Sequence, residues 1–174
     1  MKNTVLKFGA LAGSLLVVLM IVPTFFYDMK NTAMYRLSEI IGYISMLLSL
    51  CVIFVGMRKY RAQSGDVMSF GKGLLVGTGI AVVAGIIFGI ASAITYAYIH
   101  PEFMATYFEY SVNQVKQSGL PPEEIAAKIK EMEAQKAFFT NPWMGGVVMF
   151  FTVAPMGFVI AVISALLLRT KADK

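Results

Sequence analysis

The side chains that most often perform chemistry in proteins are few and scattered in this chain. It has one cysteine, Cys51, and one histidine, His100. A zinc site needs several such ligands together, and an activated nucleophile needs a base within hydrogen-bond reach. The glutamates of residues 99–141 have no such partner in the sequence and are interpreted as a solvated face. The sequence therefore predicts no catalytic residue, no metal site, no cofactor and no enzymatic activity.

The basic stretch GMRKYRAQSGDVMSFGKG, residues 56–73, superficially resembles a phosphate-binding loop. A nucleotide-binding loop of that kind has four residues between its glycines and a Ser or Thr after the lysine. Here five residues separate Gly65 from Gly71, and Gly73 follows Lys72. The stretch is instead predicted to fix the orientation of the chain in a membrane. Its basic residues are also candidate contacts for the headgroups of anionic phospholipids: Arg58, Lys59, Arg61 and Lys72.

Composition places the chain in a lipid environment. Of its 174 residues, 57% are hydrophobic and 14% are charged, against about 25% charged residues in soluble domains. The mean hydropathy is +0.70. The net charge of +5 does not indicate nucleic acid, because the basic residues lie at the ends of apolar runs. The bilayer is therefore the first predicted partner, and nucleic acid is not a predicted one.

Four long apolar runs define the predicted fold. A membrane-crossing helix needs about 20 mostly apolar residues. Runs of this length predict helices over residues 4–26, 39–57, 70–98 and 142–168. They are too long for the strands of a membrane barrel and lack the alternation of such strands. We therefore expect an all-α membrane protein with four transmembrane helices, in which residues 1–174 form a single integral membrane domain.

Lysine and arginine residues gather on one side of these predicted helices. That side holds both chain ends and the segment that follows residue 57. Cytoplasmic segments of membrane proteins carry an excess of Lys and Arg. The sequence therefore predicts that both termini are cytoplasmic, an N-in/C-in topology, and that residues 27–38 and 99–141 lie outside.

The outer insertion, residues 101–139, is predicted to be an amphipathic helical hairpin between the third and fourth transmembrane helices. Its first half carries a broad aromatic face, which suits the interface between membrane and water. We expect Phe103, Tyr107 and Phe108 to act there as an interfacial wedge. Whether the hairpin lies on the membrane or stands free of it is left open by the sequence.

The third predicted helix carries small residues at every fourth position. Such rows allow the backbones of two membrane helices to approach closely. Because an i+4 row winds around its helix, we expect two different partners rather than one straight helix. Candidate partners carry shorter small rows, Gly9 and Gly13 in the first helix and residues 157–165 in the fourth, and Ile87 is expected to face away. The row consists of Gly73, Gly77, Ala81, Gly85, Gly89, Ala93 and Ala97.

Several short motifs resemble one family of small four-helix membrane proteins from Bacteroidetes, the domain-of-unknown-function family numbered four-one-nine-nine. The motifs are the opening MKNTVLKFG, YISM, GMRKYR followed by SFGKG, NPW, and the closing LLLRTK. The resemblance covers nearly the whole chain. It implies a multi-pass protein of the bacterial inner membrane with no assigned activity, so no site residues are carried over from it.

Two functions remain open at this point. The small-residue row and the lack of reactive groups favour a non-enzymatic scaffold or accessory protein that acts through transmembrane and interfacial helix contacts. Its protein partner would be a second copy of the chain or another membrane protein. The alternative is a subunit of a small oligomeric transporter or channel, although the predicted helices carry no charge at depth of the kind that marks an ion pathway.

Overall fold

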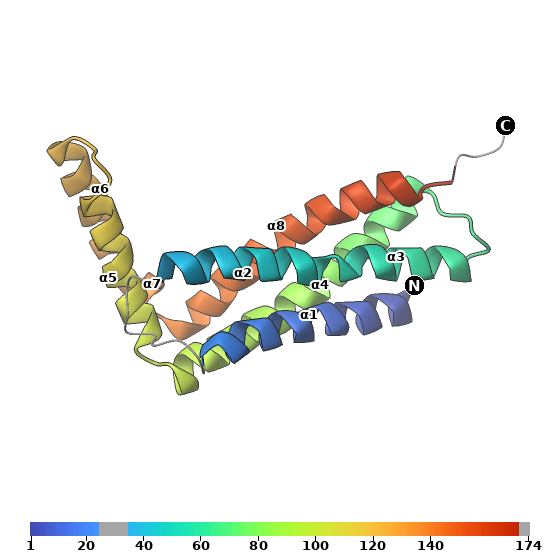
Figure 1. The fold of residues 1–174 in the computed structure, drawn as a ribbon, viewed down its shortest axis with the longest axis horizontal. Helices are drawn as coiled ribbons and strands as arrows, with labels where there is room; N and C mark the ends of the chain where they lie inside the picture. The colour runs from blue at the N-terminus through green and yellow to red at the C-terminus, as the bar shows by residue number, and fades with distance from the viewer. Residues whose placement is uncertain (25–34, 171–174) are drawn as a thin grey trace.

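The structure is a computed structural model that describes residues 1–24 and 35–170 (Figure 1). Over these residues the regular elements are helices, with no strand. Four segments are long and apolar enough to cross a membrane: Lys2–Val22, Glu39–Gln63, Phe70–Ile99 and Pro142–Leu168. The prediction of four such helices is confirmed. Most of the predicted outer loop at residues 27–38 lies outside the described residues.

The first two spans differ from their predicted bounds, residues 4–26 and 39–57. Helix α1 covers Lys2–Thr24, and the second span consists of α2 (Tyr35–Leu50) and α3 (Val52–Gln63). The two join at Cys51, whose backbone N–H donates to the carbonyl oxygens of both Leu47 and Leu48 at 3.1 and 3.2 Å. The helix continues beyond the end predicted at residue 57, so the basic residues that follow lie on its last turns and not in a loop.

The last two spans agree closely with the predicted ones. Helix α4 (Phe70–Ile94) continues as a π-helix, η2 (Thr95–Ile99), and α8 covers Pro142–Leu168. Asn141 begins α8, because its side-chain oxygen accepts hydrogen bonds from the backbone N–H groups of Trp143 and Met144 at 2.9 and 3.4 Å. Pro142 occupies the first helical position, where its missing N–H costs nothing.

Three shorter helices between η2 and α8 form a segment that we call the arm. They are α5 (Phe103–Lys116), α6 (Pro122–Ala134) and α7 (Lys136–Phe139). Figure 1 shows α5 and α6 side by side, running across the direction of the long helices. The arm lies at one end of the bundle, and residue 1 and the α3–α4 connection lie at the other, which we call the basic end. Thr170, just after α8, is also at the basic end, where its N–H donates to the carbonyl oxygen of Met68 at 3.0 Å.

The small-residue row of α4 packs against α8 from Gly73 to Ala93, and we call this contact the seam. A Cβ atom placed on Gly77 would lie 2.7 Å from the Cβ of Ala161. Farther along, a Cβ atom on Gly89 would lie 2.8 Å from the carbonyl oxygen of Gly146. Residues 73–93 of the row are buried, and Ala97 is half-buried.

One helix therefore follows the row, and the expectation of two partners is wrong. The physical reason is that α8 presents small residues of its own at both ends of the contact, Gly146 at one and Gly157, Ala161 and Ala165 at the other, while Phe150 faces Gly85 between them. A row of small residues with a period longer than 3.6 residues winds around its own helix. It stays in contact with one partner helix when that helix winds around it in the same sense.

Helix α1 packs against the other side of α4 through a different kind of contact. A Cβ atom on Gly9 would lie 2.6 Å from the Cβ of Val83, and one on Gly13 would lie 2.9 Å from the Cβ of Ile87. These glycines make room for branched side chains and do not meet the small-residue row. Ile87 consequently packs against α1, which corrects the expectation that it faces away.

Candidate functional site

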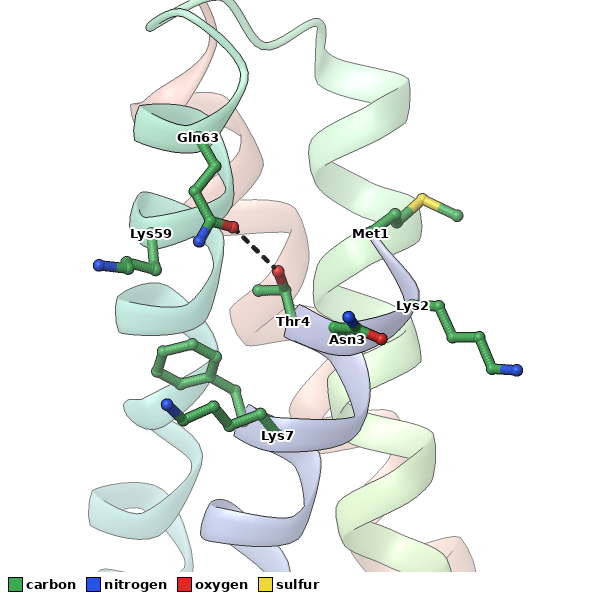
Figure 2. Close-up of a pocket in the computed structure, with 8 residues that line it drawn as sticks. Met1, Lys2, Asn3, Thr4, Lys7, Lys59 and Gln63 are labelled. Carbon is green, nitrogen blue, oxygen red and sulfur yellow. Dashed lines mark hydrogen bonds between the residues drawn. The ribbon is translucent and has the colours of Figure 1, made fainter.

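Two regions outside the packed core bring polar and aromatic side chains together, one at the basic end and one at the arm. At the basic end, a pocket of about 500 Å³ opens between the first turns of α1 and the last turns of α3. Figure 2 shows the side chains that line it. They are Met1, Lys2, Asn3, Thr4, Lys7, Phe8, Lys59 and Gln63.

Close packing between α1 and α3 holds the two walls of this pocket together. A Cβ atom on Gly56 would lie 2.9 Å from the Cβ of Phe8, so only glycine allows the two helices this approach. One turn nearer the end, the hydroxyl of Thr4 donates to the side-chain oxygen of Gln63 at 3.4 Å (Figure 2). Thr4 is 7% exposed, whereas Gln63 is exposed. The two walls are therefore held together by packing and by a polar contact between two residues that are 59 positions apart in the sequence.

The pocket is strongly positive. Lys2, Lys7 and Lys59 line it, and no carboxylate does. In the part of the chain that the structure describes, none of these lysines forms an ion pair, and the ion pair nearby joins Arg61 and Asp66. Like charges around one opening repel each other, and physiological salt screens this repulsion only in part when the charges lie within one pocket. The arrangement therefore suits an anion, which would relieve that repulsion.

At the other end, the arm is attached to the bundle by a row of aromatic rings. Phe103, Tyr107 and Tyr110 lie on one face of α5, because residues three and four apart in a helix are neighbours. The ring of Tyr96 from η2 stacks on Phe103 with centroids 5.1 Å apart. The next two pairs in the row have centroid distances of 5.8 and 6.0 Å. The row continues the last turn of the third span directly into the arm.

A hydrogen bond joins this row to the second span. The phenol of Tyr107 donates to a carboxylate oxygen, Oε1 of Glu39, at 2.8 Å. Burial and the neighbouring Glu39 raise the pKa of Tyr107 well above its ordinary value, since both disfavour the phenolate. Tyr107 is therefore a neutral donor throughout the physiological pH range.

A family model matches residues 7–170 of the chain. The chain belongs to this family, described as Protein of unknown function (DUF4199). No curated protein and no solved structure matches it. Roles for residues of this DUF4199 member therefore rest on its own geometry. The residues that the structure describes contain no group of three or more His, Cys, Asp or Glu that could hold a metal ion.

Only one of the four predicted headgroup contacts of this DUF4199 chain lines the pocket, and that is Lys59. The Arg61 side chain turns away to the α3–α4 connection, where its Nε donates to the carbonyl oxygen of Asp66 at 3.2 Å. Arg58 and Lys72 are exposed at the same end of the bundle, outside the pocket. The sequence did place Lys2 and Lys7 on the basic side, but nothing in it showed that α1 and α3 are neighbours.

The three residues of the predicted interfacial wedge all make contacts within the protein. Phe108 is 7% exposed and lies beneath Lys136, whose Nζ is 5.5 Å from its ring centroid. Phe103 and Tyr107 belong to the aromatic row that holds the arm. Phe108 is thus buried within the protein, whereas Phe103 and Tyr107 are half-buried.

Proposed function

We propose that this DUF4199 member is a non-enzymatic scaffold or accessory protein of the bacterial inner membrane that presents its arm to another membrane protein. The observation that carries the proposal is the exposure of α6, none of whose residues is buried. A helix with no buried residue contributes little to the stability of the bundle. Its surface is therefore free to contact a partner.

The bundle offers a fixed base for such an arm. The seam brings backbone against backbone at Gly89 and Gly146, close to where the arm leaves η2 and returns to α8. A Cβ atom on Gly145 would lie 3.0 Å from the terminal carbon of Met104 on α5, so the start of α8 touches the arm directly. The exposed face of α6 mixes both charges, Glu123, Glu124, Lys128, Lys130, Glu131 and Glu133, and favours a polar partner surface.

The proposed location follows from charge. Lys2, Lys59 and Lys72 gather at the basic end, and the positive-inside rule then puts that end and both termini in the cytoplasm. The arm would accordingly face the periplasm, where it could meet a partner in the same membrane.

Two hydroxyl groups of the long helices, those of Ser49 and Thr95, give the rival function of transport no specific support. Ser49 donates to the carbonyl oxygen of Ser45 at 2.8 Å, and Thr95 donates to that of Ala91, also at 2.8 Å. Hydroxyls bonded to the preceding turn of their own helix are satisfied without a transported ligand.

Photo-crosslinking in living cells tests the proposal. A photoreactive amino acid would replace Ala127 or Lys130, both exposed on α6, with Leu167 of α8 as the control because it is 70% exposed on an apolar helix. We expect discrete protein adducts from the two arm positions and none from the control. Absence of adducts at the arm, together with solute flux in vesicles that contain the purified protein, would replace the scaffold by a transporter.

A further inference from the structure

We propose that the pocket between α1 and α3 binds the phosphate of an anionic phospholipid, with Lys7 and Lys59 as its main cationic contacts. This inference goes beyond the scaffold proposal and stands or falls separately from it. The shared chemistry is that of a phosphate group, and the lipid is chosen over a soluble anion from the position of the pocket.

The first argument is the direction of the polar groups. Figure 2 shows Lys7 and Lys59 extending to the same side of the α1–α3 pair, whereas Lys2 extends to the other side. The oxygen of the Gln63 amide accepts from Thr4, and its nitrogen lies toward Lys59 (Figure 2). That nitrogen can donate to an anion held by the two lysines. The two lysines and the amide thus come from neighbouring helices and line the same pocket.

The second argument is the level of the pocket relative to the apolar spans. The first span begins at Lys2 and the second ends at Gln63, so the pocket sits where both helices leave the apolar layer. Leu11 and Val55, both 54% exposed, lie one turn deeper than Lys7 and Lys59 on the same two helices. A phospholipid could place its phosphate at the lysines and its acyl chains along these side chains. A soluble anion would leave this apolar surface unused.

The test compares two pairs of charge-removing substitutions in the full-length purified protein. The pocket pair is Lys7→Gln with Lys59→Gln, and the control pair is Arg58→Gln with Lys72→Gln. All four residues are exposed and lie at the basic end, and both pairs remove two positive charges. Binding of phosphatidylglycerol to the delipidated protein is measured by native mass spectrometry, and helix content is checked by circular dichroism.

We expect the pocket pair to weaken phosphatidylglycerol binding by about 25-fold, because each lysine at a membrane surface contributes about five-fold. The control pair should weaken it far less, and Lys7→Arg with Lys59→Arg should retain most of it. Equal losses in the two pairs would mean diffuse attraction by surface charge and would overturn the proposal. Displacement of the lipid by inorganic phosphate at constant ionic strength would also overturn it, in favour of a site for a soluble anion.

Discussion

The seam and the arm are held by opposite kinds of contact. In the seam, glycine faces glycine, and the carbonyl oxygen of Gly89 would lie only 2.5 Å from a Cβ atom on Gly146. The arm is held by side chains, through stacked rings and the hydrogen bond from Tyr107 to Glu39. Backbone atoms cannot move aside without moving a helix, whereas side chains can rotate. A single added methyl group should therefore disrupt the seam, while the arm should tolerate substitution and respond to pH.

The largest effect is expected for Gly89→Leu. A leucine has no room against the backbone of α8, and overpacking of this kind costs about 3 kcal/mol at its upper range. Thermal unfolding of the purified protein in detergent should show a marked loss of stability. Gly42→Leu is the matched control, because Gly42 is exposed on α2 and a Cβ atom there meets nothing within 4 Å.

The same variant distinguishes a seam within one subunit from a seam between copies. Because α4 and α8 belong to one chain, the apparent mass of Gly89→Leu should equal that of the unchanged protein. A shift toward a smaller species, with stability preserved, would place the small-residue row between subunits and break the comparison drawn above.

A smaller effect sharpens the distinction between backbone and side-chain neighbours within the seam. At Gly85 an added Cβ atom would lie 3.0 Å from a ring carbon of Phe150, which can rotate, and at Gly89 it would meet a carbonyl oxygen. We expect Gly89→Ala to destabilise the protein by about 1–3 kcal/mol. Gly85→Ala should cost clearly less. Equal losses of unfolding free energy in the two variants would contradict the proposed role of the Gly89–Gly146 contact.

Tyr107→Phe should weaken the attachment of the arm to the bundle by about 1 kcal/mol, which is the net contribution of one hydrogen bond. Cleavage by a protease between residues 116 and 122 should become faster, while the thermal stability of the bundle changes little. If the bundle loses stability as much as the arm loses protection, then the two regions are not separately held.

The pH dependence of the arm follows from the same residue. The folded pKa of Tyr107 is raised above the ordinary value of 10.0, so its contribution is present below about pH 10 and is lost as the pH rises further. Protection of the arm from protease should therefore decline in alkaline solution in the unchanged protein. Tyr107→Phe should show a smaller decline from pH 9 to pH 11, with the other tyrosines providing the common background.

The smallest effect is expected for Lys136→Gln. The ammonium group lies 5.5 Å from the ring centroid of Phe108 but is exposed, and such contacts contribute about 0.5 kcal/mol. Protease protection of the arm should change by less than in Tyr107→Phe. A larger loss than that would mean that the Lys136 contact, and not the aromatic row, secures the arm.

Local signals were enough to predict the elements themselves. The apolar run over residues 142–168 predicted both bounds of α8 correctly, and Asn141 and Pro142 set its start locally, because a cap and a proline act within one turn. The second span was predicted to end at Met57, but α3 continues for six more residues to Gln63. Polar residues can extend a helix into water without changing the apolar pattern.

By itself, the sequence determined that four helices can cross a membrane, that basic residues gather at one end, and that a backbone must approach the small-residue row of α4. Only the tertiary structure decided whose backbone that is, that Lys7 and Lys59 share a pocket, and that Phe108 is covered. The physical reason is the separation in sequence over which each interaction acts. Helix formation, capping and charge position depend on neighbours within a few residues. Gly89 meets Gly146, and Lys7 and Lys59 come to line one pocket, only after distant helices have packed.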